Sequence, residues 1–164
     1  FEREASGLSG TGVVSFMPGT KLAKLYDYAL CMGWRYDGWP QYYYQACFGA
    51  VSLLNPRIAP TGTLKTSALE AGVAYRYAEE MLDRFLPYTG RSRMDSPVGT
   101  GNAYDHAFQA ARKLDDDLLR QIRAEFGSFG TINDPVRFAS LTAGVLTPGE
   151  ASLLSSPFDW YAPQ

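Results

Sequence analysis

Apolar residues recur three or four positions apart in four long segments of this chain, the spacing that lines one face of an α-helix. The segments are residues 20–32, 39–54, 67–86 and 103–126. Patterns typical of strands are weak throughout. A chain of 164 residues is long enough to bury one core. The pattern therefore predicts a single all-α domain, built as a bundle of four helices.

Residues that commonly begin or end helices mark the limits of these segments. Thr20 can cap the first segment, and Pro40 lies in the first turn of the second. Asn102 can cap the fourth segment, with Asp105 three residues on as a capping-box-like partner. The residues that can end the first three segments are Gly33, Pro56 and Pro87. We therefore expect one continuous helix in each segment.

The rest of the chain is predicted to form connections and the ends of the domain. We expect an irregular or partly extended N-terminal arm over residues 1–18 and a core over about residues 19–146. A short helix or turn is predicted around residues 134–144. The connections are a proline-containing segment at 55–65 and a long loop at 87–102, a length that is often functional. The tail, residues 147–164, is rich in proline and serine and is predicted to be exposed.

Composition narrows the class of protein without identifying it. Hydrophobic residues make up 46% of the chain and charged residues 20%, which is typical of a globular domain. The net charge is -2, so any nucleic-acid site must be a local cluster of arginine and lysine. Cys31 and Cys47 lie in apolar surroundings and are predicted to be buried thiols in a reducing compartment. His106 is the only histidine, which excludes a metal site that needs several.

Charged residues gather in two stretches, Arg91-Ser92-Arg93 and residues 111–117. On a continuous helix over residues 103–126, four charged side chains of both signs would share one face. They are Arg112, Asp116, Arg120 and Arg123. One interpretation is a solvated face crossed by salt bridges. The other is a strip that binds RNA, with arginine on phosphates and aspartate accepting from a ribose hydroxyl or a base amino group. Charge alone does not separate the two.

Four segments, taken in order, resemble the coat proteins of rod-shaped positive-strand RNA viruses of the tobacco mosaic virus (tobamovirus) type. They are Ala74-Tyr75-Arg76-Tyr77 with Met81-Leu82-Asp83, Thr89-Gly90-Arg91-Ser92-Arg93-Met94, Ala111-Arg112-Lys113-Leu114-Asp115-Asp116, and residues 132–146 around Phe138. These look like the family's Tyr-Arg-Tyr helix, Thr-Arg-Asn-Arg element, Arg-Arg-Val-Asp-Asp signature and short C-terminal helix. The gap between the second and third segments fits the family without an insertion. The ordered set, rather than any single motif, carries the resemblance.

The resemblance implies a coat-protein fold, a four-helix bundle with a short extra C-terminal helix, that assembles helically around single-stranded RNA. Arg91 and Arg93 would neutralise phosphates, and the third segment would line the same groove. The predicted RNA-binding residues, with Arg123 added from the charged strip, are Arg91, Arg93, Arg112, Lys113, Asp115, Asp116 and Arg123. The chain would be found in the virion, assembled in the host cytoplasm, with itself and RNA as partners and no enzymatic activity or membrane association.

The family also places carboxylates of adjacent subunits close together, where one takes up a proton or a cation. The candidates here are Asp83, Asp95 and Asp105. Calcium between subunits is the one candidate ligand, and no other metal or cofactor is predicted.

The sequence departs from the family in several places. The paired arginines of the signature are Arg112 and Lys113, which loses one bidentate donor. The helix at 39–54 has Tyr42, Tyr43 and Tyr44 where the family has an arginine near the RNA. The same helix lacks the family's glutamate in its second half. These tyrosines are interpreted as aromatic packing between helices or subunits, with a base-stacking platform as the alternative. The pattern is that of a distant relative.

Three other functions are weighed against a rigid-rod coat. A monomeric helical adaptor or scaffold would have the same charged face but would not bind RNA. An enzyme would use Asp105 and His106, but neighbouring residues on a helix point apart. A coat of the flexuous-filament type lacks this order of motifs. The order therefore favours the rigid-rod coat.

Overall fold

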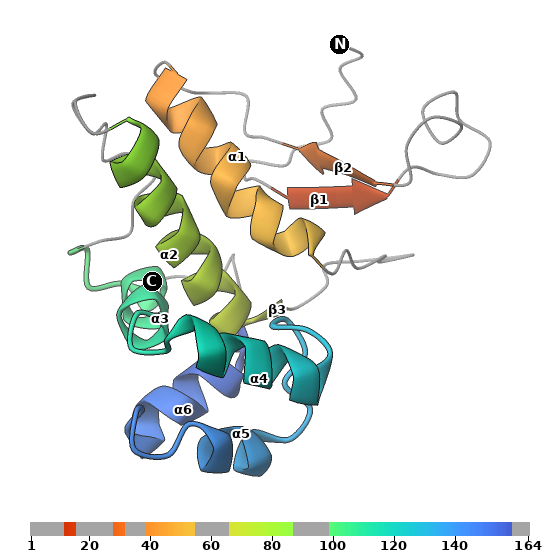
Figure 1. The fold of residues 1–164 in the computed structure, drawn as a ribbon, viewed down its shortest axis with the longest axis vertical. Coiled ribbons are helices and arrows are strands. Elements are labelled where there is room, and N and C mark those ends of the chain that lie inside the picture. Colours follow the sequence, from red (N-terminus) through yellow and green to blue (C-terminus); the bar gives the residue numbers. More distant parts are fainter. Residues whose placement is uncertain (1–11, 16–27, 32–38, 55–65, 87–98, 159–164) are drawn as a thin grey trace.

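Over residues 12–15, 28–31, 39–54, 66–86 and 99–158, the computed structural model of this chain is predominantly helical (Figure 1). The helices are α1 (Trp39–Leu53), α2 (Ala68–Phe85), α3 (Ala103–Ala111), α4 (Asp116–Phe126), α5 (Pro135–Leu141) and α6 (Pro148–Ser155). Two short antiparallel strand pairs accompany them, β1 (Gly12–Ser15) with β2 (Tyr28–Cys31), and β3 (Thr66–Ser67) with β4 (Pro157–Phe158). None of the helices within these ranges is long and apolar enough to cross a membrane.

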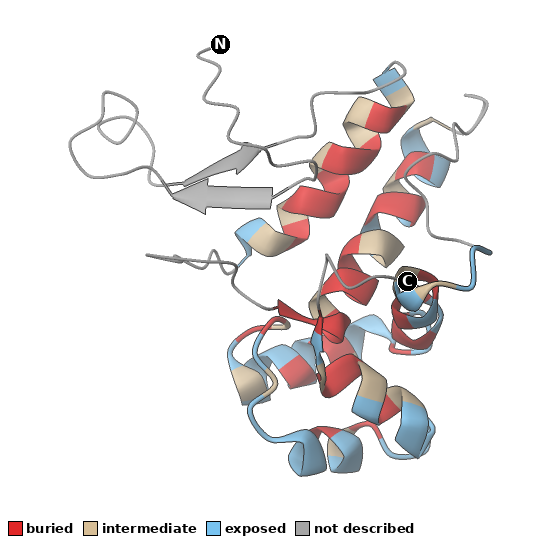
Figure 2. Ribbon diagram, turned by 180° about the vertical axis from the view of Figure 1, so that it is seen from behind, coloured by how far each residue is buried: buried red, intermediate tan, exposed pale blue. Residues whose placement is uncertain are grey.

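Helices α1 and α2 form an antiparallel pair at the centre of the described fold (Figure 1). Their limits confirm the predictions at 39–54 and 67–86, and Ser67 caps α2 by accepting a hydrogen bond from the Glu70 amide at 3.3 Å. Buried residues run along both helices (Figure 2). The ring of Tyr75 on α2 meets that of Phe48 on α1 at 4.6 Å between centroids. Cys47 is buried in the same core, as predicted.

Helix α3 approaches α2 at Gly72, closely enough that no side chain fits there. A Cβ added to Gly72 would lie 2.4 Å from the carbonyl oxygen of Ala107 and 2.8 Å from Cβ of Ala111. Ala107 and Ala111 are fully buried on the facing side of α3. Small residues on both helices therefore bring the two backbones together.

The prediction of an exposed tail is confirmed at residues 147–149 and wrong over most of residues 151–158, which pack against the core. Leu154 of α6 is fully buried, and the ring of Phe158 meets that of Tyr104 on α3 at 4.9 Å. The Ala68 amide donates to the carbonyl oxygen of Ser156 at 3.0 Å. This segment thereby joins the beginning of α2 to α3.

The short helix predicted at 134–144 is confirmed as α5. Asp134 caps it, accepting from the Arg137 amide at 2.9 Å. Phe138 is fully buried and packs edge-on against Phe126 of α4, with 6.1 Å between centroids.

Two of the predicted helices differ from the structure. Residues 28–31, placed in a helix at 20–32, form strand β2, in which Leu30 lies opposite Val13 of β1; residues 20–27 lie outside the described ranges. The helix predicted at 103–126 is interrupted between Ala111 and Asp116. The cause of the first difference is pairing with a distant strand, which overrides local helical spacing. The cause of the second is a set of polar contacts at the interruption.

Candidate nucleic-acid interface

The interruption between α3 and α4, residues 112–115, is here named the elbow. The amides of Lys113 and Leu114 donate to carbonyl oxygens three residues back, at 3.2 Å each, which is a tightened last turn. Asp115 then adopts an extended backbone and caps α4, accepting from the Leu118 amide at 2.7 Å. Leu114 is fully buried. A local cap and a buried leucine thus turn the chain at the third segment of the resemblance.

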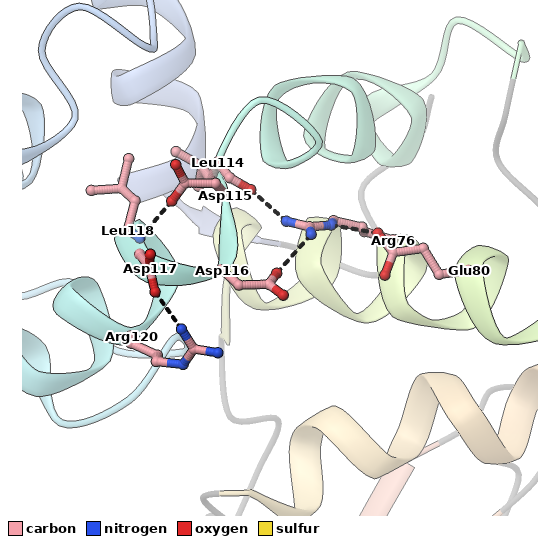
Figure 3. A network of polar contacts seen from close by, with 8 residues as sticks. All are labelled: Arg76, Glu80, Leu114, Asp115, Asp116, Asp117, Leu118 and Arg120. Atoms are coloured by element: carbon pink, nitrogen blue, oxygen red, sulfur yellow. Dashed lines mark hydrogen bonds and ion pairs between the residues drawn. The ribbon is translucent and has the colours of Figure 1, made fainter.

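Arg76 of α2 ties the elbow to the core (Figure 3). Its Nη1 donates to the carbonyl oxygen of Leu114, its Nη2 pairs with Asp116 Oδ1 at 2.8 Å, and its Nε pairs with Glu80 Oε1 at 2.7 Å. The Arg76 side chain is only 17% exposed, whereas that of Asp116 is 70% exposed. A donor from α2 therefore satisfies a backbone acceptor that the interruption leaves outside any helix. The sequence did not predict that Arg76 lies at this site.

Lys113, next along the elbow, reaches the C-terminal helix. Its Nζ lies 2.6 Å from Glu150 Oε1. Glu150 is also the third residue of a capping box, because its Oε2 accepts from the Thr147 amide at 2.9 Å while Thr147 Oγ1 accepts from the Glu150 amide at 3.3 Å. The hydrogen bonds from Lys113 and Thr147 lower the pKa of Glu150 to about 2. This carboxylate is therefore ionised under ordinary conditions.

The arginines predicted to form one strip do not share a helix face. The elbow separates Arg112 from α4, so Arg112 falls out of register with the others. It is exposed, its guanidinium lies 5.4 Å from the centre of the Phe108 ring, and among the described residues it has no ion pair. Arg120 pairs with Asp117, and Arg123 Nη2 donates to the carbonyl oxygen of Leu54 at 3.1 Å. Of the predicted RNA-binding residues within the described ranges, Arg112 thus presents the most available charge.

The remaining predicted site residues divide into two groups. Arg91, Arg93 and Asp95 lie outside the described residues. Asp83 lies on the exposed side of α2, and Asp105 is buried in the first turn of α3.

Asp105 contributes to the cap of α3 as predicted, but its carboxylate accepts from the Gly101 amide and not from that of Asn102. Asn102 Oδ1 accepts from its amide at 3.0 Å, and its own carboxylate accepts from Gln109 Nε2 at 3.1 Å and from the Gly101 amide at 3.0 Å. The hydrogen bonds from Gln109 and Gly101 lower the pKa of this carboxyl group. Asp105 therefore has a structural role within one subunit. The carboxylate switch and its calcium concern contacts between subunits and stay predictions.

The three consecutive tyrosines of α1 have different surroundings. Tyr44 is buried and its hydroxyl donates to Glu79 Oε1 at 3.1 Å, and Tyr43 packs edge-on against Phe85 of α2. Tyr42 stacks on Trp39, with ring planes 16° apart. Packing between helices therefore accounts for Tyr43 and Tyr44, as the sequence indicated.

Comparison with family models, with curated proteins and with solved structures finds no match for this chain. We therefore infer the function from the residues and their geometry.

Proposed function

We propose that this chain is a structural coat protein that polymerises helically around single-stranded RNA, as in rod-shaped viruses of the tobacco mosaic virus type. The observation that carries the proposal is the meeting of two segments of the resemblance. Arg76, of the Tyr-Arg-Tyr segment, bonds to Leu114 and Asp116 of the Arg-Lys-x-Asp-Asp segment, 38 and 40 residues further along the chain. Motifs that are contacting parts of one site are a stronger basis for the resemblance than motifs scattered over the surface.

The packing of the helices supports the finer part of the proposal, a four-helix bundle of the coat-protein type. Helix α1 packs against α2, α2 packs against α3, and α5 follows as a short C-terminal helix anchored by the buried Phe138. Strand β2, where the first helix was predicted, is a departure from that architecture.

In the proposed mechanism the elbow faces the RNA backbone. Arg112 supplies an exposed guanidinium whose fork fits a phosphate. Lys113 adds a second positive charge, and the segment that carries Arg91 and Arg93 joins α2 to α3. A few cations per subunit are enough to balance the phosphates that each subunit covers, which is compatible with a net charge of -2. A repeating head-to-tail contact that does not close would extend the assembly into a rod.

The alternative, a monomeric helical adaptor that does not bind RNA, is favoured by one observation. Lys113, Asp115 and Asp116 each have a partner within the same chain, so a structural role is sufficient to explain them. The two proposals differ in what they expect of Arg112, which is exposed and would have no role in an adaptor.

Electron microscopy with negative stain, near pH 5 and pH 8 and with and without single-stranded RNA, separates the two proposals. A coat protein forms disks or rods in at least one condition, whereas an adaptor stays a small monomer in all four. In a binding assay with labelled RNA, Arg112→Gln should weaken binding and reduce the salt dependence by about 0.7 in slope, the contribution of one phosphate contact. Arg137→Gln, which removes an exposed arginine paired with Glu125, is the matched control and should leave the slope unchanged.

A further inference from the structure

The carboxylate of Glu150 pairs with the ammonium group of Lys113, which is the group that would otherwise bind a phosphate. The two oxygens of this carboxylate have separate partners, Oε1 bonding to Lys113 Nζ at 2.6 Å and Oε2 accepting from the amide and the hydroxyl of Thr147 at 2.9 Å each. The Glu150 side chain is 25% exposed. The hydrogen bonds from Thr147 therefore hold the carboxylate at the beginning of α6, beside the lysine.

Helix α6 is itself secured to the core, so Glu150 is presented by a rigid support. Ala151 and Leu154 are buried, α6 packs against both α2 and α3, and strand β4 continues from it to pair with β3. Lys113 lies at the elbow beside Arg112, the exposed cation of the candidate interface. An anion of the chain thus occupies one of the two adjacent cations that RNA would use.

We infer that Glu150 is an affinity-determining residue that restrains RNA binding by competing with phosphate for Lys113. The inference rests on the proposed function, and it predicts that removal of this one carboxylate, which lies beside a predicted RNA-binding lysine, strengthens binding. A purely structural role of Glu150 predicts the reverse, because loss of a structural contact weakens binding or leaves it unchanged.

The size of the effect follows from the exposure of the pair. Lys113 is 46% exposed, so the contact belongs among partly exposed ion pairs. Such pairs contribute up to about 1 kcal/mol, so releasing Lys113 is expected to strengthen RNA binding by up to about fivefold at low salt. A lysine that gains one phosphate also raises the salt slope by about 0.7 for a single strand.

Glu150→Gln is the informative variant because it removes the charge and keeps the cap. Glutamine at this position can still accept from the Thr147 amide, as in a capping box with Gln. Glu125→Gln is the matched control. Glu125 of α4 pairs with Arg137 of α5 at 3.0 Å, and its replacement changes the net charge by the same amount as Glu150→Gln. Lys113→Gln, alone and combined with Glu150→Gln, completes a double-mutant cycle.

The experiment measures binding of a fluorescein-labelled oligouridylate by anisotropy over a series of salt concentrations, with thermal melting to verify that each variant is folded. Glu150→Gln should bind more tightly and with a steeper salt dependence than both wild type and Glu125→Gln. That gain should vanish when Lys113 is also replaced. Wild-type binding with no gain in Glu150→Gln, or a gain that persists without Lys113, overturns the inference alone. Absence of RNA binding in all folded variants overturns the proposed function and the inference together.

Discussion

Replacement of Arg76 by methionine tests whether α2 holds the elbow in place. Methionine keeps an unbranched side chain along the helix surface but has no donor. The substitution removes the hydrogen bond to the carbonyl oxygen of Leu114 and the ion pairs with Asp116 and Glu80. The stem can still pack, so the loss is confined to the polar contacts.

The size of the change in unfolding free energy depends on which of these contacts is shielded from water. Asp116 is 70% exposed and Glu80 is 52% exposed, so their pairs contribute little. The hydrogen bond to Leu114 involves a charged donor that is 17% exposed, and bonds of this kind contribute about 1.5–3 kcal/mol. We therefore expect Arg76→Met to lower the free energy of unfolding by about 2 kcal/mol, most of it from the Leu114 contact.

Urea unfolding followed by circular dichroism gives this difference, provided that the dependence on urea has the same slope in both proteins. Hydrogen exchange shows which part of the fold is destabilised. At the beginning of α4, the Leu118 amide donates to the side chain of Asp115 and the Leu119 amide donates to its backbone carbonyl. These amides should lose protection in Arg76→Met. Arg137→Met is the control. It removes an ion pair in which the Arg137 side chain is 55% exposed and that of Glu125 is 41% exposed. Equal losses of unfolding free energy for the two substitutions, or unchanged exchange of the Leu118 amide, would show that Arg76 does not hold the elbow.

Three further predictions concern the packing, the cap and the acid behaviour of the fold. Gly72→Ala should lower stability by about 1–3 kcal/mol because its Cβ would meet Ala107 O at 2.4 Å; calorimetry giving an unchanged melting temperature would argue against the close approach of α2 and α3. Asp115→Ala should cost about 1 kcal/mol through the lost cap of α4, whereas Asp115→Asn should recover most of it; equal urea midpoints for the two variants would contradict the cap. The pKa of Glu150 is lowered from 4.5 to about 2, so its stabilising contribution is present above pH 4.5 and is lost as the pH falls toward 2. The difference in unfolding free energy between wild type and Glu150→Gln should therefore shrink over this range, and a difference independent of pH would count against the ion pair.

The helices that bury a full apolar face were predictable from the sequence. In α1 and α2 the local spacing and the packing agree, and Pro40 and Ser67 mark the first turns. Strand β2 was not predictable in the same way, because Tyr28–Cys31 acquires its conformation from pairing with Gly12–Ser15. Local spacing contains no information about that partner.

The interruption at the elbow shows the limit of periodicity most clearly. Residues 103–126 contain neither glycine nor proline, and their apolar spacing continues through the interruption. The available signal was the run Asp115-Asp116-Asp117 before Leu118, since acidic residues gather at the beginning of helices. Arg76, which holds the elbow from α2, has no signal in its local sequence for that role.

The helical tail did have a signal. Thr147-Pro148 followed by Glu150 combines a capping box with proline at the first helical position. Because the tail is rich in proline and serine, it was nevertheless predicted to be exposed, without a helix. The partner of Glu150 could not be predicted, because it depends on how α6 packs against α3.

Whether the chain assembles helically around RNA can be decided from the length of the particles that it forms with two single-stranded RNAs of different length. Electron microscopy after nuclease treatment gives that length, and recovery of the RNA shows whether it was protected. We expect rods whose length rises in proportion to the length of the RNA, because each subunit would cover a fixed number of nucleotides. Particles of one length with both RNAs, or a monomer with degraded RNA, would contradict it.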